Sequence, residues 1–190
     1  DTSYIDSSIQ TIFSGYSDNE LSSKVIGLYH NKKKVEYHDA LNKEILVIVE
    51  NTPFYPEGGG QISDTGVIET ESCSLLVTNV QKINNIIVHQ AILQSGVIRL
   101  GDDILLKINN DRRKKIAANH SSTHLLNQAL RDTLGDHVEQ KGSLVTDKYL
   151  RFDFSHNKAL SIDEIRKIET IISFEINSDR ETLQKMSSYK

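Results

Sequence analysis

Along residues 24–110, short runs of β-branched and aromatic residues alternate with polar, turn-forming segments. The runs recur at roughly ten-residue spacing, which is typical of a small antiparallel barrel or sandwich. We therefore expect a β-rich domain in this part of the chain. The expected strands lie at 25–29, 35–38, 45–50, 75–80, 86–91 and 104–108.

From residue 111 the hydrophobic period changes to 3.6, which predicts a long helix. Asp111 is expected to cap its N-terminus, and Gly135 is expected to end it. Ser161 and Glu164 form a capping box, which predicts the start of a second helix. This part of the chain is therefore expected to be α+β. The strands expected between the helices lie at 138–145 and 149–154.

The first 23 residues are mostly polar, and their apolar residues recur at helical spacing. We interpret this leader as the end of a helix from a preceding helical domain, with Gly15 as its stop. The chain starts at Asp1, and residues 180–190 show no ending element, so we expect a piece that stops within its last domain. The expected domains are 1–23, the leader; 24–110, the barrel; and 111–190, an α+β domain truncated at its C-terminus. The apolar leader residues are Ile5, Ile9, Ile12 and Phe13.

The composition excludes several classes of protein. Of 190 residues, 37% are hydrophobic, and Leu, Ile, Val and Phe together exceed the roughly 20% below which chains remain disordered. The longest aliphatic run, at 45–49, is far shorter than the ~20 residues of a membrane-spanning helix. The one cysteine, Cys73, excludes an internal disulfide and a four-thiolate zinc site. With no secretory signal at its start, the chain is expected to be cytoplasmic and outside any membrane.

The charge is unevenly distributed along the chain. The whole chain carries a net charge of −4, whereas residues 111–151 carry eight basic and five acidic side chains. A basic segment of this kind can face a phosphate backbone. On charge alone, solvated surface lysines and arginines are the better interpretation.

Two histidines occur four residues apart in the first predicted helix, in the run HSSTH. Residues at this spacing share a helix face, so His120 and His124 could hold one metal ion. The spacing alone is a weak signal, and two histidines on a solvated face are the simpler alternative. Zinc also needs at least three protein ligands. The other candidates, none at a convincing ligand spacing, are His30, His38, Cys73, His89, His137 and His156.

A glycine-rich run, FYPEGGGQISDTG, occupies residues 54–66. Three successive glycines allow positive φ angles and a close approach to a ligand, although a plain hairpin turn has the same composition. No Gly-Lys-Ser/Thr follows, so a nucleotide phosphate loop is not expected. Residues 59–61 also form GGQ, the tripeptide of release factors that hydrolyse peptidyl-tRNA, but a tripeptide match is weak evidence.

A third segment, residues 140–156, places Gln140, Ser143, Arg151 and Asp153 on strands beside the histidine helix. If that sheet packs behind the helix, some of these side chains could reach the same pocket. By periodicity alone, they are better explained as the polar face of a surface sheet.

Together and in this order, the three segments strongly resemble the editing region of the alanyl-tRNA synthetase family and its free-standing relatives, the AlaX deacylases. The resemblance covers residues 24–190, and the leader resembles the segment that joins the aminoacylation half of such a synthetase to its editing region. The matching runs are FYPEGGGQISDTG at 54–66, NHSSTHLLNQALRDTLGDHVEQKGSL at 119–144 and LRFDFSH at 150–156.

The resemblance implies a barrel like those of translation factors, followed by the α+β editing domain shared with threonyl-tRNA synthetase. The reaction would hydrolyse the ester that joins serine or glycine to the terminal adenosine of tRNA(Ala), so the expected partner is the acceptor end of that tRNA. His120 and His124 match the first two zinc ligands of the family. Thr123 matches a pocket residue that senses the serine side chain, and Gln140 matches a residue of the editing site.

The family completes its zinc site with a downstream Cys-Gly-Gly-Thr-His run, which is absent from this sequence. We therefore expect two further Zn²⁺ ligands beyond residue 190, and little zinc binding or hydrolysis by this chain alone. The resemblance also implies that the parent protein attaches alanine to tRNA(Ala), with ATP and Mg²⁺ bound in an aminoacylation domain outside this sequence. Whether the parent is a homo-oligomer stays open.

Two other interpretations also stay open. One is a free-standing AlaX-type deacylase, although the residues before Lys24 and the missing ligand pair argue against it. The other is a metal-free module that binds tRNA or another partner and has no catalytic activity. A Cys-x-x-x-His run further along the gene would exclude this second alternative.

Overall fold

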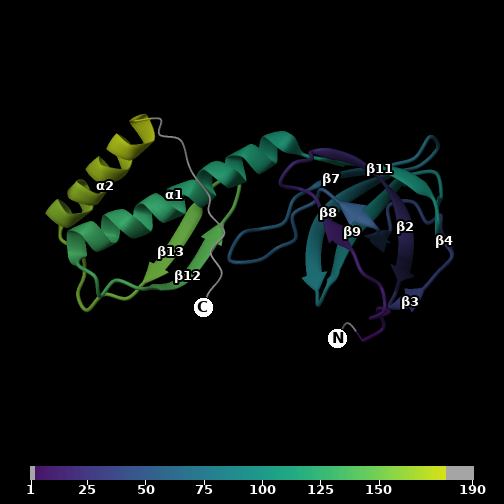
Figure 1. Cartoon of the computed structure of the whole chain (residues 1–190), viewed down its shortest axis with the longest axis horizontal. Coiled ribbons are helices and arrows are strands. Elements are labelled where there is room, and N and C mark those ends of the chain that lie inside the picture. The colour runs from purple at the N-terminus through teal and green to yellow at the C-terminus, as the bar shows by residue number, and fades with distance from the viewer. Residues whose placement is uncertain (1–2, 179–190) are drawn as a thin grey trace.

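The computed structural model describes residues 3–178, and its larger part is a closed antiparallel β-barrel (Figure 1). The strands of this sheet are β2 (Glu20–His30), β3 (Lys33–Lys34), β5 (Glu44–Val49), β7 (Gly66–Glu69), β8 (Ser74–Ile83), β9 (Ile86–Ser95) and β11 (Asp103–Ile108). Six of them follow one another in the order β11-β7-β8-β9-β5-β2, and pairing of β11 with β2 closes the barrel. The short strand β3 extends the sheet beyond β2. The expected barrel is therefore confirmed.

Two small strand pairs accompany the barrel. Strand β1 (Ile12–Phe13) pairs in parallel with β6 (Asn51–Thr52), and β4 (Tyr37–His38) pairs antiparallel with β10 (Ile98–Arg99). The first pair places the leader beside the start of the glycine-rich segment, which matters for the site described below.

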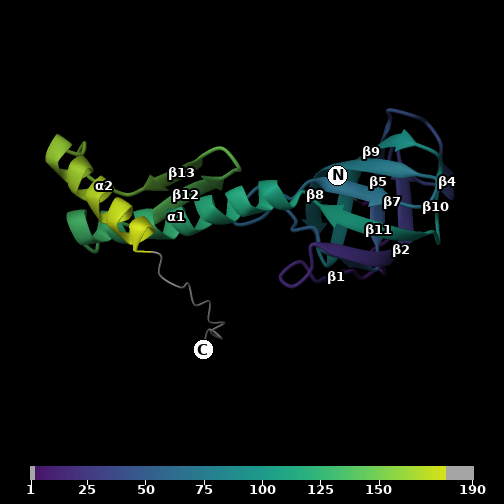
Figure 2. The same cartoon turned by 90° about the horizontal axis from the view of Figure 1, so that it is seen from above.

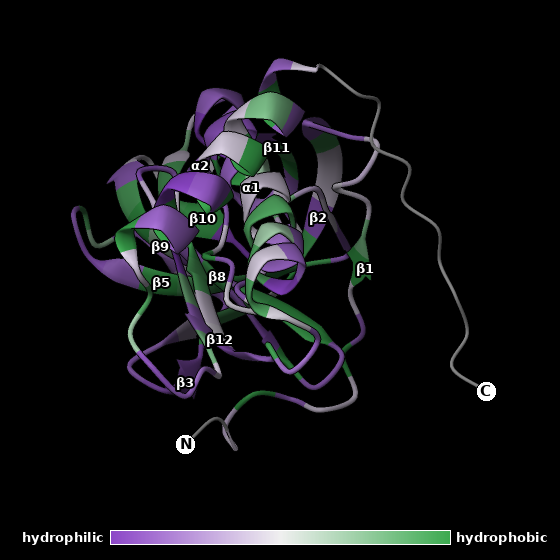
Figure 3. Ribbon diagram, turned by 90° about the vertical axis from the view of Figure 1, so that its left-hand side faces the viewer, coloured by the Kyte–Doolittle hydropathy of each residue, from purple (hydrophilic) through white to green (hydrophobic). Residues whose placement is uncertain are grey.

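The barrel closes because alternate side chains of its strands point into one apolar core. Along β8, for example, Leu75, Val77 and Val80 are fully buried, while a register shift after Val77 keeps the inward positions aligned. Hydrophobic residues (green in Figure 3) lie along the strands, whereas the dilysine strand β3 is hydrophilic (purple).

The prediction of a helix in the leader is wrong. Within the described residues, the leader forms turns and the short strand β1. Ile5 and Ile9 pack on the outside of the barrel against Tyr29, Ile48 and their neighbours, and the backbone N–H of Asp6 donates to the Tyr29 hydroxyl at 3.1 Å. The spacing that suggested a helix instead serves contacts with a barrel surface that the local sequence does not reveal.

The rest of the described chain is an α+β unit built on one long helix, in agreement with the expectation. Its elements are α1 (Asn110–Leu134), β12 (Gln140–Val145), β13 (Leu150–Phe154) and α2 (Ile162–Asn177). In Figure 1, α1 runs out of the barrel and lies between α2 and the β12–β13 hairpin, and Figure 2 shows the barrel at one end of α1 and α2 near the other. Ala129 and Leu130 form its core with Val138 and Ile168, flanked by Phe152 and other partly buried residues.

Two of the three features expected at the helix ends are observed. Gly135 ends α1, and Ser161 and Glu164 form the expected capping box of α2. Asp111 is not the N-cap of α1, because Asn109 has the extended backbone of a cap and its side chain accepts from the Arg112 N–H at 3.0 Å. Asp111 instead lies in the first helical turn.

Most expected strands coincide with observed ones, but their bounds differ. The strand expected at 35–38 is reduced to β4, and β2 begins at Glu20, before the expected barrel boundary. The irregular end expected at residues 180–190 lies outside the described residues. Among residues 3–178, no helix combines the length and the hydrophobicity needed to cross a membrane.

Candidate functional site

His120 and His124 lie on one face of α1, as their spacing predicts. Their ring centroids are 5.1 Å apart, and the ring planes are inclined by 47°. His120 is partly buried and His124 is exposed. The structure therefore brings together the two residues that the sequence indicated as metal ligands.

The loop between β6 and β7, residues 53–65, extends from the barrel to the β12–β13 hairpin (Figure 1). We refer to it as the Gly-rich loop. The Gly60 carbonyl accepts from the Val145 N–H at 2.7 Å, and the Ile62 N–H donates to the Val145 carbonyl at 3.1 Å. Gly59 and Gly60 have φ angles of 60° and 83°, and a Cβ on Gly60 would collide with Ser143. Glycine is thus required where the loop backbone meets the hairpin.

Gln61, directly after the three glycines, connects the Gly-rich loop to the histidine pair. Its Oε1 lies 2.7 Å from Nδ1 of His120. Because a carboxamide oxygen only accepts, Nδ1 of His120 donates this bond, and Nε2 keeps its lone pair. Burial, and secondly the electrostatic effect of His124, lowers the pKa of His120, so its ring is neutral at pH 7. The sequence pattern did not identify Gln61 as a partner of His120; its position after the glycines was the available signal.

Thr123 is buried on α1, with 7% of its surface exposed. Its hydroxyl donates to the Asn119 carbonyl one turn earlier, at 2.8 Å. The hydroxyl hydrogen is thereby used, and the oxygen retains lone pairs that can accept a hydrogen bond. The residue expected to sense a serine side chain could do so only by accepting from the serine hydroxyl.

Gln140 lies exposed at the start of β12, and its Nε2 donates to the Ser143 hydroxyl at 3.2 Å. Ser143 in turn packs against the glycines of the Gly-rich loop. Within residues 3–178, Gln140 makes no hydrogen bond to either histidine, so its connection to them runs through Ser143 and the loop. Arg151 and Asp153 form an exposed ion pair at 3.2 Å, as a polar surface of the hairpin would.

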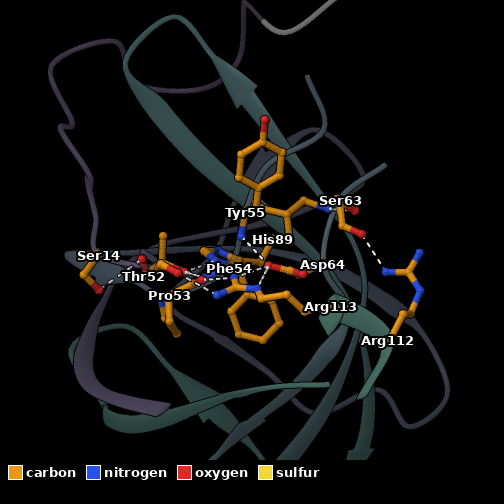
Figure 4. A network of polar contacts seen from close by, with 12 residues as sticks. Ser14, Thr52, Pro53, Phe54, Tyr55, Ser63, Asp64, His89, Arg112 and Arg113 are labelled. Atoms are coloured by element: carbon orange, nitrogen blue, oxygen red, sulfur yellow. Dashed lines mark hydrogen bonds and ion pairs between the residues drawn. The ribbon is translucent and has the colours of Figure 1, made fainter. Parts of the chain in front are cut away.

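The Arg113 side chain of α1 bonds to residues of the leader and of the Gly-rich loop (Figure 4). Its guanidinium forms an ion pair with the buried carboxylate of Asp64, including an Nε–Oδ2 contact of 3.1 Å, and donates to the Gly15 and Pro53 carbonyls at 2.6 and 2.5 Å. The same Asp64 oxygen accepts from the Tyr55 N–H at 2.7 Å. One side chain therefore fixes the leader, the Gly-rich loop and the histidine helix relative to one another.

A second buried group, His89, supports the start of the Gly-rich loop (Figure 4). Its Nδ1 lies 3.1 Å from the Val47 carbonyl and its Nε2 lies 2.7 Å from the Thr52 hydroxyl, which also accepts from the Phe54 N–H. Nδ1 must donate to the carbonyl, so Nε2 accepts from Thr52. Burial lowers the pKa of His89 to about 4, which keeps this chain of hydrogen bonds intact at neutral pH.

The histidine pair could supply two ligands of a metal site. Among residues 3–178, no group of three or more His, Cys, Asp and Glu side chains is arranged to hold a metal ion. His137 and His156 contact each other, Nε2 to Nδ1 at 2.9 Å, and Cys73 is buried in the barrel core. Two imidazole nitrogens are suitable zinc ligands, although they are fewer than a complete site needs. Gln61 accepts a hydrogen bond from Nδ1 of His120, and hydrogen bonds of this kind orient metal-binding imidazoles.

Comparisons with known proteins point in one direction. Residues 2–112 match the family model of the class II (A) tRNA synthetases. Over 164 residues, 86% of this chain, the sequence is 43% identical to the alanine–tRNA ligase of Blochmanniella floridana. The matched region is 18% of the length of that relative.

Proposed function

Because the chain belongs to the class II (A) tRNA synthetase family, we propose that it is a region of an alanine–tRNA ligase that removes wrongly attached amino acids. The α+β unit would hydrolyse the ester between serine or glycine and the terminal adenosine of tRNA(Ala). The observation that carries this proposal is the pairing of His120 with His124 on one face of α1, with the His120 ring held by Gln61 of the Gly-rich loop.

His120 and His124 would hold a zinc ion with ligands from outside the described residues. When bound, zinc supplies a Lewis acid that polarises a carbonyl or activates a water molecule. Gln61 fixes the His120 ring through Nδ1, which leaves the Nε2 lone pair as the one that can bind a metal ion. The chain's contribution is thus a fixed pair of nitrogen donors on a rigid helix.

Thr123 would provide selectivity for serine. Its oxygen can accept from the serine hydroxyl, because its own hydrogen is bonded to the Asn119 carbonyl. Alanine has no hydroxyl to donate, and a polar group left unpaired on binding is penalised. Gln140, through Ser143, would hold the Gly-rich loop against the hairpin near this pocket.

The rest of the proposal concerns the whole ligase. Its ATP- and Mg²⁺-dependent attachment of alanine would occur in parts outside this chain, which spans less than a fifth of the relative's length. The α+β unit would correspond to the editing domain of threonyl-tRNA synthetases, and the exposed basic side chains of residues 111–151 would contact the tRNA phosphates. The enzyme would act in the cytoplasm.

The test is hydrolysis of seryl-tRNA(Ala) by the intact ligase with a His120→Ala substitution. We expect the hydrolysis rate to fall at least a hundredfold, while attachment of alanine, in another part of the protein, continues. His30→Ala is the matched control, since His30 lies on the barrel and contacts the Glu44 carbonyl and Asn31. Hydrolysis by His120→Ala at the control's rate would contradict the proposal.

A further inference from the structure

A cavity of about 390 Å³ lies between the leader, the Gly-rich loop and α1. Phe13, Tyr16 and Tyr55 line one part of it, and Gln61, His120 and Ser121 line another. Its volume falls in the lower part of the range for small-molecule sites. Since His120 lines the cavity, whatever binds there lies beside the first histidine of the pair.

The leader side of the cavity is a cluster of aromatic rings. Phe13 meets Tyr16 edge to face with ring centroids 5.1 Å apart, and meets Tyr55 in the same way at 6.0 Å. Phe13 is held in place because β1 pairs with β6. Tyr16 is 79% exposed, so its ring has surface available for stacking. Figure 4 shows the Tyr55 ring directed away from the Asp64–Arg113 ion pair.

The polar groups of the cavity favour an uncharged occupant with hydrogen-bonding edges. Arg113 lines the cavity, but its charge is taken up by Asp64 and by two backbone carbonyls. A phosphate would therefore find no unpaired arginine there. Within the described residues, the Gln61 amide nitrogen and the Ser121 hydroxyl have no hydrogen-bond partner, so both are available to a ligand. Flat rings with polar edges, as in a nucleobase, match this combination.

We propose that this cavity binds the terminal base of the tRNA, with Tyr16 as the residue on which the base stacks. The inference rests on the proposed function, because the base and the aminoacyl ester of one nucleotide are separated only by the ribose. A base held beside His120 would present its ester to the helix face that carries His120 and His124. Tyr16 is then a positioning residue, supplied by the leader rather than by the α+β unit.

The test measures binding of adenosine and of the trinucleotide CCA to this chain, by titration calorimetry and by saturation-transfer NMR. Tyr16→Leu should weaken CCA binding by about 5- to 150-fold, the range that loss of one base–aromatic stack produces. Tyr16→Phe keeps the ring and should bind within twofold of the unmodified chain. Tyr37→Leu, which changes another exposed tyrosine on the barrel strand β4, is the matched control and should also bind normally.

Because Tyr16 and Tyr37 are both exposed, neither substitution should unfold the chain. Circular dichroism of each variant checks that the fold is kept. Absence of saturable binding of adenosine and CCA to the unmodified chain would overturn the proposal. Equal binding by Tyr16→Leu and Tyr37→Leu would overturn it as well. Ribose 5-phosphate, which lacks a base, should not compete with CCA; competition would show that the phosphate is bound instead.

The proposed hydrolytic site and the proposed base-binding cavity can be refuted independently of each other. In the intact ligase, Tyr16→Leu should raise the KM for hydrolysis of seryl-tRNA(Ala) with little change in kcat, whereas His120→Ala should abolish kcat. CCA binding that depends on Tyr16, together with full hydrolysis by His120→Ala, would support the cavity and reject the hydrolytic site. Loss of hydrolysis in His120→Ala, with no effect of Tyr16→Leu on KM, would reject the cavity alone.

Discussion

Replacing Arg113 with methionine removes one group of the contacts that join α1 to the barrel and the leader while keeping an apolar stem of similar length. The variant loses the ion pair with Asp64 and the hydrogen bonds to the Gly15 and Pro53 carbonyls. Asp64 has 3% of its side chain exposed and Arg113 has 19%, so the carboxylate would be left buried and without its cation. Breaking a buried pair in this way costs about 3–5 kcal/mol.

The assay is thermal and urea unfolding of the chain, followed by circular dichroism. At about 2–4 °C per kcal/mol for a protein of this size, Arg113→Met should lower Tm by about 6–20 °C. Lys24→Met is the control, because its ion pair with Asp103 is 3.7 Å long and exposed, and such pairs contribute about 0–1 kcal/mol.

A double variant, Asp64→Asn with Arg113→Met, separates the ion pair from the other losses. It removes both charges, so it should be less destabilised than the sum of the two single variants by about 1–3 kcal/mol. A loss for Arg113→Met no larger than that for Lys24→Met, or strict additivity in the double variant, would refute the assigned role of the pair.

Three further predictions concern residues around the site. Burial lowers the pKa of His89 from 6.5 to about 4. Between these two pH values, His89 is protonated in the unfolded chain and neutral in the folded chain. The free energy of unfolding should therefore fall by about 2 kcal/mol between pH 7 and pH 5, and urea titrations of His89→Gln should lack this part of the decrease. Gly60→Ala should speed hydrogen exchange of the Val145 amide, since its Cβ collides with Ser143, whereas Gly58→Ala, whose backbone φ is not positive and whose Cβ would meet only the Pro56 carbonyl at 3.9 Å, should leave that exchange slow. Ser161→Ala should lower the unfolding free energy by about 1 kcal/mol, measured by urea titration, through loss of the α2 capping box.

The fold was predictable where local pattern and tertiary packing agree. The alternating runs between residues 24 and 110 became barrel strands, because one face of each strand fills a common core. The leader shows the opposite case: Ile5 and Ile9 have helical spacing, yet they pack on the outside of the barrel. Asn109 and Asp111 are both good capping residues, and the extended backbone that follows β11 decides in favour of Asn109. Neither outcome is encoded within a short window of sequence.

In the candidate site, too, contacts within one helix were predictable from the sequence, whereas contacts between distant segments were not. The pairing of His120 with His124 follows from helix geometry alone. The contact of His120 with Gln61 joins residues 59 positions apart, and that of Arg113 with Asp64 joins residues 49 positions apart. The glycines before Gln61 marked a close approach of the backbone, but they did not identify the hairpin as its partner. Likewise, no local signal joined Tyr16 of the leader to the cavity beside His120.

The central claim is that this region removes serine from tRNA(Ala) and spares alanine. The most direct measurement compares the single-turnover hydrolysis rates of seryl-tRNA(Ala) and alanyl-tRNA(Ala) by the intact ligase. The account predicts that the seryl ester is hydrolysed at least about a hundredfold faster, because only serine can donate to the Thr123 oxygen. Equal rates for the two esters, or no hydrolysis of either, would contradict it.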